Sequence, residues 1–217
     1  MTKIGLILTL GSILAASSIA QANSYGARLE YAEYEGAGCP QGSVSVQMAP
    51  DASSFTVLFD RFDMRAGAGL SQVSMDCDIK LKFKKSKFFS FAVNSADFRG
   101  FAFLDPQVRG KIESKVKTGN TNFVQGATSS FALENLIGPM NENFILTTQR
   151  VLSGTDTLAC FPFKDSMVVL IKTKIGISGA GGSLVGQMTV DSADGRLAQK
   201  YSLKWMNCLG RILGGSR

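Results

Sequence analysis

The stretch Val73-Ser-Met-Asp-Cys-Asp-Ile-Lys-Leu-Lys-Phe83 decides the fold class, because apolar and polar residues alternate along its whole length. Successive side chains of a β-strand point to opposite faces of a sheet, so strict alternation predicts a strand with one buried face. Weaker alternation recurs in residues 44–48, 55–59, 108–117 and 197–205. Fuller apolar runs at residues 88–93, 101–104 and 167–171 predict strands that are covered on both faces.

Turn-forming residues separate these runs. Glycine, proline, asparagine or aspartate cluster at residues 36–42, 50–51, 65–69, 119–120, 138–139, 153–154, 179–182 and 194–195. About ten short strands without an amphipathic helix predict an all-β fold, an antiparallel β-sandwich whose jelly-roll or immunoglobulin-like topology stays open. We expect a single domain over residues 23–208 and a flexible tail over residues 209–217.

The N-terminus has the pattern of a secretory signal peptide. A basic start at Lys3 precedes an apolar run over residues 4–16, and small residues lead up to Ala22. A membrane anchor would need about 20 consecutive apolar residues, and Gly11 and Ser12 interrupt this shorter run. The sequence therefore predicts a signal peptide at residues 1–22, cleavage near Ala22, no transmembrane segment, and a secreted or periplasmic protein.

Export also decides how the 4 cysteines are interpreted. In an oxidising compartment widely spaced cysteines form disulfides, and no Cys-x-x-Cys pair is present to bind zinc. Four cysteines allow three pairings. The pairing that closes the two shortest loops joins Cys39 to Cys77 and Cys160 to Cys208, and we expect these two disulfides.

Three local patterns are more specific than the periodicity. They are Gly36-x-Gly38-Cys39-Pro40-x-Gly42, Ala96-Asp97-Phe98-Arg99-Gly100, and Asp191-Ser192-x-Asp194-Gly195-x-x-x-Gln199-x-Tyr201-x-Leu203-x-Trp205-x-x-Cys208. With these patterns the chain resembles the secreted family catalogued as domain of unknown function 4360, from about Gly36 to Cys208. The resemblance implies export and paired cysteines, and it implies no catalytic role. This chain departs from the family where Thr157-Leu158-Ala159 precede Cys160, because members often carry tryptophan there.

The absence of histidine excludes several enzyme classes. A Ser-His-Asp triad, a Cys-His pair and a histidine-ligated zinc all require an imidazole group. Paired carboxylates could still hydrolyse glycosides, and Asp60 with Asp63, Asp76 with Asp78, or Asp97 beside Arg99 are the candidates. Solvent-facing partners for lysine explain the same residues more simply.

Positive charge gathers on predicted strands, within a net charge of +6. Lys80, Lys82 and Lys84 share the outward face of one strand, and Arg109, Lys111, Lys115 and Lys117 line another. If the two strands lie in one sheet, these seven side chains would form a cationic face that attracts polyanions. The alternative is a solvated face whose lysines prevent aggregation.

Other candidate ligand sites are weaker. Asp191, Ser192 and Asp194 could bind calcium, but a hairpin turn explains them better. Phe88, Phe98 and Phe103 could stack on a ligand, although most of the 15 phenylalanines belong in the core. We therefore expect neither a metal nor another cofactor.

The sequence thus predicts a non-enzymatic binding module for an anionic envelope or extracellular polymer, such as an anionic glycan. A carbohydrate hydrolase and a purely structural secreted protein are the alternatives. Nucleic acid is not an expected partner of an exported chain, and the oligomeric state stays open.

Overall fold

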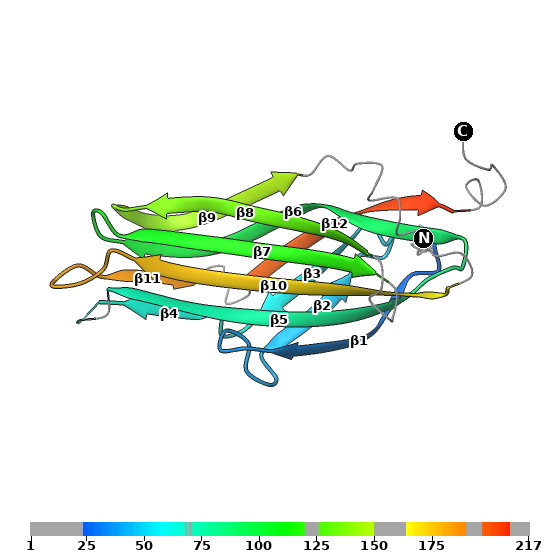
Figure 1. Ribbon diagram of the computed structural model, residues 1–217, viewed down its shortest axis with the longest axis horizontal. Coiled ribbons are helices and arrows are strands. Elements are labelled where there is room, and N and C mark those ends of the chain that lie inside the picture. Colours follow the sequence, from blue (N-terminus) through cyan, green and yellow to red (C-terminus); the bar gives the residue numbers. More distant parts are fainter. Residues whose placement is uncertain are drawn as a thin grey trace, which may run out of the picture.

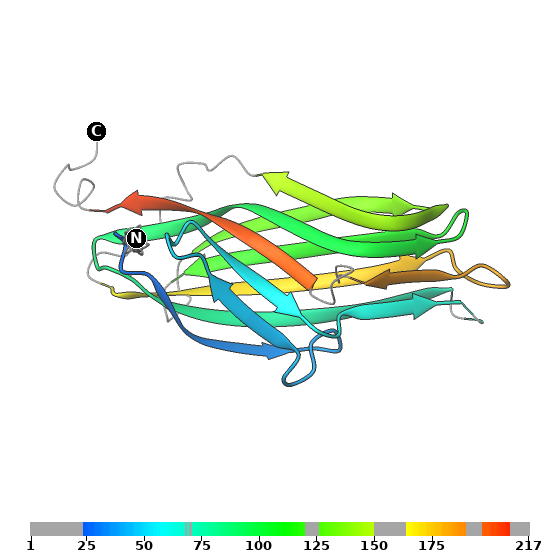
Figure 2. The ribbon, with the colours of Figure 1, turned by 180° about the vertical axis from the view of Figure 1, so that it is seen from behind.

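The computed structural model describes residues 24–67, 69, 71–119, 126–149, 164–189 and 197–208. Its strands form two antiparallel sheets that lie face to face in an elongated molecule (Figures 1 and 2). Sheet A has five strands in the spatial order β1 (Arg28–Glu35), β5 (Gln72–Lys84), β10 (Ser166–Ser178), β7 (Arg109–Gly119) and β8 (Gly126–Ile137).

Sheet B is organised around the long strand β6 (Phe89–Leu104). One edge of β6 pairs first with β12 (Leu197–Asn207) and then with β11 (Gly186–Thr189), and its other edge pairs with β9 (Met140–Gln149). Strands β3 (Ser54–Phe59) and β2 (Val44–Met48) extend the sheet beyond β12, and β4 (Asp63–Ala66) extends it beyond β11.

The period-two pattern predicted most of these strands, and the all-β class is confirmed. One prediction was wrong: residues 89–93 and 101–104 are parts of the single strand β6, and Phe88 lies just before it. Sequence reasoning also missed β1, β4, β8, β9 and β11. In β1 a β-bulge between Leu29 and Tyr31 interrupts the alternation. Within the described ranges no helix has the length and apolar character needed to cross a bilayer.

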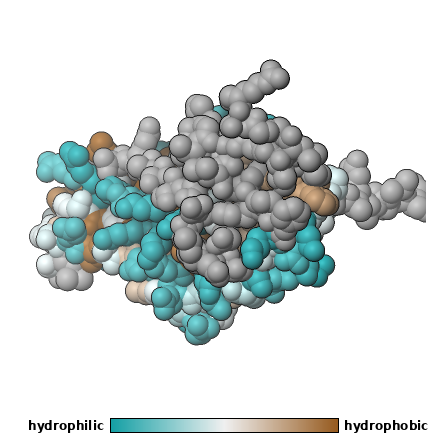
Figure 3. Space-filling view, turned by 45° about the vertical axis from the view of Figure 1, so that its right-hand side comes forward, coloured by the Kyte–Doolittle hydropathy of each residue, from teal (hydrophilic) through white to brown (hydrophobic). Residues whose placement is uncertain are grey.

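A continuous apolar core fills the space between the sheets. The Phe83 ring of sheet A lies between two rings of sheet B, with centroids 5.4 Å from Phe55 and 5.6 Å from Phe91. All three side chains are fully buried. The described part of the exterior shown in Figure 3 is largely hydrophilic, with separate small hydrophobic areas.

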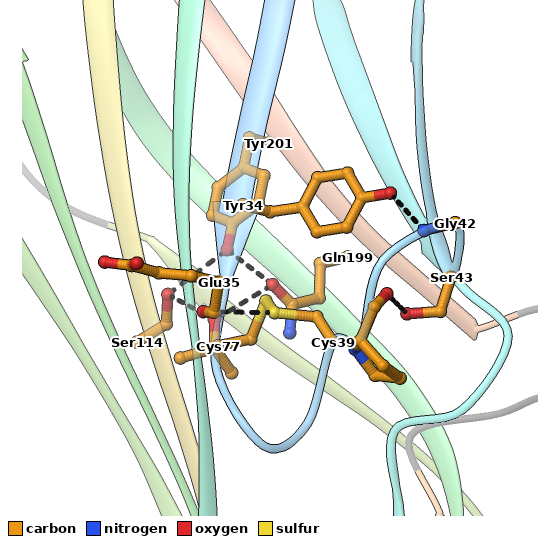
Figure 4. The surroundings of a disulfide bond; sticks show 11 residues. Tyr34, Glu35, Cys39, Gly42, Ser43, Cys77, Ser114, Gln199 and Tyr201 are labelled. Carbon is orange, nitrogen blue, oxygen red and sulfur yellow. Dashed lines mark hydrogen bonds between the residues drawn. A yellow bond between two sulfur atoms is a disulfide. The ribbon is translucent and has the colours of Figure 1, made fainter.

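A disulfide between Cys39 and Cys77 ties the β1–β2 connection to strand β5, with Cα atoms 5.5 Å apart (Figure 4). The connection approaches β5 so closely that a Cβ at Gly36 would lie 2.4 Å from the Asp76 carbonyl oxygen. Gly36 also has φ of +135°, which other residues rarely adopt. The first predicted bridge is therefore confirmed. Cys160 lies outside the described residues, so its bridge to Cys208 stays a prediction, as do the signal peptide and the tail.

A buried polar cluster lies next to this disulfide (Figure 4). The Tyr201 hydroxyl donates to Gln199 Oε1 over 2.8 Å and lies 3.1 Å from the Ser114 hydroxyl. Thr173, which pairs with Cys77 across β10 and β5, donates to the same Gln199 oxygen over 3.1 Å. Since Gln199 and Tyr201 belong to sheet B and Thr173 and Ser114 to sheet A, these hydrogen bonds join the two sheets through the core.

Candidate binding face

All seven predicted cationic residues lie on the solvent-facing side of sheet A, which we call the outer face. Alternation along β5 and β7 turns Ile79, Leu81, Phe83, Ile112 and Val116 into the core and the basic residues outward. The two strands are not neighbours, because β10 lies between them. Strand β10 adds Lys172 and Lys174 to the same face, so the basic residues form one continuous region.

The lysines of β5 are largely neutralised by acidic neighbours. Lys80 pairs with Glu33 over 2.8 Å and Lys82 with Glu30 over 3.1 Å, both across the β1–β5 pairing. Lys84 lies 3.5 Å from Asp165. The Lys80 hydrogen bond to Glu33 raises the pKa of the lysine, and the ammonium of Lys84 lowers the pKa of Asp165. This half of the outer face therefore has little free positive charge.

Lys80 and Lys82 also lie over the ring of Tyr31. Their Nζ atoms are 5.6 Å and 5.7 Å from the ring centroid. Ammonium groups at this distance interact with the electron-rich face of the ring. These contacts hold the two lysines against β1.

The other half of the outer face, on β7 and β10, keeps its charge. Arg109, Lys115, Lys117 and Lys174 form no ion pair within the described chain, and we call these four residues the free cations. Lys115 lies directly opposite Lys172 in the β7–β10 register, although Lys172 itself pairs with Asp78. Like charges directly opposite each other destabilise a sheet.

Glu113 is an acidic exception among these cations. Its carboxylate pairs with Lys111, and the hydrogen bond from this lysine lowers the pKa of Glu113. Lys115 and Lys174 lower it further by their charges. One carboxylate surrounded by three ammonium groups leaves this region with a net positive charge.

Lys85 does not belong to the outer face, although it continues the run of basic residues in the sequence. Its side chain is only 3% exposed, and its Nζ donates to the Lys164 carbonyl oxygen over 2.7 Å. Burial lowers the pKa of this ammonium group to about 8. Lys200 and Lys204, also basic, belong to β12 in sheet B. Only part of the basic sequence therefore contributes to one surface.

The outer face of sheet A carries shallow depressions. One, of about 340 Å³, lies over Lys80, Leu170 and Lys172 beside β1. A second, of about 190 Å³, lies over Gly176. Six of its nine lining residues have polar side chains, and the lining consists of Gln72, Val73, Ser74, Lys111, Glu113, Lys174, Gly176, Ile177 and Ser178.

The candidate catalytic carboxylates lie on open surfaces. Asp76 and Asp78 share the outer face as predicted, and they border a depression of about 210 Å³, but Asp78 is bound to Lys172. Asp60 and Asp63 are exposed near β4, and Asp97 and Arg99 point away from the core of sheet B.

The remaining candidates are the predicted calcium site and three phenylalanines. Within the described residues no three acidic or cysteine side chains gather closely enough to hold a metal ion, and Asp191, Ser192 and Asp194 lie outside those residues. Phe98 is fully buried and belongs to the core. Phe88 is 42% exposed, and Phe103 is half-buried on the outer side of sheet B.

Comparison with known proteins places the chain in a family. The sequence profile described as "Domain of unknown function (DUF4360)" matches residues 26–208, which include every described strand. The chain belongs to the DUF4360 family. A relative in Arthroderma benhamiae, described as an "Uncharacterized secreted protein", is 27% identical over 178 residues, covering 81% of this chain and 69% of the relative.

Solved structures offer only remote likenesses to this DUF4360 protein. TmCBM61 in complex with beta-1,4-galactotriose has a TM-score of 0.22 and 9% identity, over 82% of this chain and 89% of TmCBM61. The enzymatically active domain of bacteriophage CBA120 tailspike protein 4 has a TM-score of 0.26 and 8% identity, over 80% of this chain and 19% of that one. Both TM-scores are too low to indicate a shared fold.

Proposed function

We propose that this DUF4360 protein is a secreted, non-enzymatic binding protein that holds an anionic extracellular polymer on the outer face of sheet A. The observation that carries the proposal is the row of free cations on β7 and β10. Lys115 faces Lys172 across the strand pair, and Lys117 and Lys174 stand two residues further along their strands. Side chains two residues apart on one strand face are about 7 Å apart, so several ammonium groups can reach one chain of anionic groups.

The ion pairs indicate which of the predicted cationic residues are available to bind a polymer. Four of the seven predicted residues, Lys80, Lys82, Lys84 and Lys111, already pair with carboxylates. Polyanion binding gains free energy by releasing counterions from the ligand, and a lysine that is already neutralised contributes little to this release. We therefore assign binding to Arg109, Lys115, Lys117 and Lys174, and not to the lysines of β5.

A pair of matched variants tests this assignment. Lys115→Gln/Lys117→Gln and Lys80→Gln/Lys82→Gln both remove two positive charges, the first from the free cations and the second from existing ion pairs. On a dextran sulfate column the first variant should elute at clearly lower salt than wild type. The slope of log affinity against log salt concentration should become shallower by about one to two, which corresponds to one or two fewer counterions released on binding. The second variant should elute much closer to wild type.

A loss of stability would not explain earlier elution of the Lys115→Gln/Lys117→Gln variant. Because Lys115 faces a like charge, its replacement by glutamine should leave the melting temperature unchanged or raise it slightly. Equal elution shifts for the two variants would show that only net charge matters and would overturn the assignment. Absence of salt-dependent binding by the wild type would overturn the proposed function itself.

Secretion is part of the proposal, and two observations support it. The chain begins with the signal pattern of residues 1–22, and the fungal relative is named a secreted protein. We expect a mature protein that begins near Asn23, forms one domain to residue 208, and carries a second bridge from Cys160 to Cys208. Peptide mapping of protein recovered from the culture medium would test the N-terminus and the bridge: an intact Met1 or two free thiols at these cysteines would contradict them.

A further inference from the structure

Mostly polar side chains surround Gly176 on the outer face. It pairs with Ser74 on β5 and with Lys111 on β7, and Lys174 and Ser178 flank it on its own strand. The next positions on the neighbouring strands hold Gln72, Asp76, Arg109 and Glu113. The missing side chain at the centre produces the depression of about 190 Å³.

Backbone geometry does not require glycine at this position. A Cβ built on Gly176 would meet its nearest neighbours at 3.6 Å and 3.8 Å, which are ordinary van der Waals contacts. Gly176 is not among the residues with positive φ. A glycine inside a strand weakens the sheet, because it adds backbone entropy to the unfolded state and no side chain to pack. What distinguishes Gly176 is therefore the empty space that the missing side chain leaves on the outer face.

The walls of the depression combine two kinds of chemistry. Lys174, on the strand of the glycine, supplies an ammonium group that suits a carboxylate, whereas Lys111 on β7 is paired with Glu113, which also lines the depression. Ser74, Ser178 and Gln72 supply hydroxyl and amide groups that can both donate and accept hydrogen bonds, which suits sugar hydroxyls. The volume is well above the about 30 Å³ that one water molecule occupies in the liquid, so it can accept part of a larger group.

We infer that the hollow over Gly176 seats one carboxylate-bearing sugar unit of an acidic polysaccharide. The inference rests on the proposed function and narrows it from anionic polymers in general to polyuronides. The uronate carboxylate lies against Lys174, Lys111 keeps its ion pair with Glu113, and the ring hydroxyls bond to the serine and glutamine side chains. The free cations Lys115 and Lys117 then contact the neighbouring units of the same chain.

Filling the hollow tests this inference without disturbing the fold. Gly176→Val places a side chain in the middle of these polar residues and favours the strand conformation. The matched control, Ser166→Val, makes the same kind of change on the outward face of the same strand, ten residues and about 33 Å away. Both variants should melt no lower than wild type.

Three probes separate the site from general electrostatics. They are trigalacturonic acid, its fully methyl-esterified form, and dextran sulfate, with binding followed by calorimetry at fixed salt. Wild type and Ser166→Val should bind the free acid at least tenfold more tightly than the ester. Gly176→Val should lose at least tenfold in affinity for the free acid, and its affinity for dextran sulfate should stay within about twofold of wild type.

Each other outcome has a definite meaning. If Gly176→Val binds the free acid as wild type does, or if acid and ester bind equally, the uronate site is wrong. Dextran sulfate binding that still depends on Lys115 and Lys117 would then leave the proposed function standing. If wild type binds neither dextran sulfate nor trigalacturonic acid, both proposals fail together.

Discussion

Removal of the Cys39–Cys77 bridge should cost this protein a large part of its stability. The two cysteines are 38 residues apart in sequence. In the chain-entropy model a bridge that closes a loop of this length stabilises the folded protein by about 4 kcal/mol at 25 °C, because it restricts the unfolded chain. For a protein of this size, that loss corresponds to a fall in melting temperature of roughly 8 to 16 °C.

The assay is urea unfolding of the double variant Cys39→Ala/Cys77→Ala, followed by the fluorescence of Trp205. The chain has a single tryptophan, and its indole stacks on Tyr25 with ring centroids 4.3 Å apart. Its emission therefore reports on the packing of one defined site. Ile79→Val, on the buried face of the same strand β5, is the control for a small loss of packing and should cost about 1 kcal/mol.

The two single variants provide the decisive comparison. Either substitution alone breaks the bridge, so each should lose nearly as much stability as the double variant. If the two single losses instead add up to the loss of the double variant, the residues act independently and the bridge is not the cause. A double-variant loss no larger than that of Ile79→Val would refute the loop-closure reasoning as well.

Three further predictions concern the buried polar groups. Tyr201→Phe removes the hydroxyl that donates to Gln199 and should lower the free energy of unfolding by about 1 to 3 kcal/mol in urea titrations, whereas Tyr31→Phe on the surface should change it by less than about 0.5 kcal/mol. Lys85 has a folded-state pKa of about 8, below that of an unfolded lysine, so the unfolded state binds more protons between about pH 8 and pH 10. Stability should rise with pH across that window in wild type and stay flat in Lys85→Met, and an equal rise in both proteins would contradict this origin. Trp205→Phe loses the 2.7 Å bond from its Nε1 to the Ala52 carbonyl oxygen and should lower the melting temperature measured by circular dichroism, with an unchanged value counting against that bond.

Much of the fold could be predicted because its signals are local. Alternation in residues 73–83 specified strand β5, its buried face and its outward lysines. The same rule failed at β6, where two apolar runs were interpreted as two strands. Residues 95–100 pair with β9, and residues 95–98 also pair with β12 on the other edge, so pairing with other strands decided the length of this one. The bulge in β1 hid a strand for the opposite reason, because it breaks the local period that sequence reasoning depends on.

The candidate site was likewise predicted only in part from the sequence. The sequence placed each lysine on the outward face of its own strand, since side-chain direction follows from the backbone repeat of a single strand. The insertion of β10 between β5 and β7 was decided by the tertiary structure, and so was the neutralisation of the β5 lysines by β1.

Gly176 gave no signal in the sequence, because a missing side chain becomes a hollow only when its neighbours surround it. The sequence by itself therefore determined which face is buried in the strands that alternate strictly, such as β5. The tertiary structure decided which charges remain free and where a ligand would fit, because both depend on contacts between residues that are far apart along the chain.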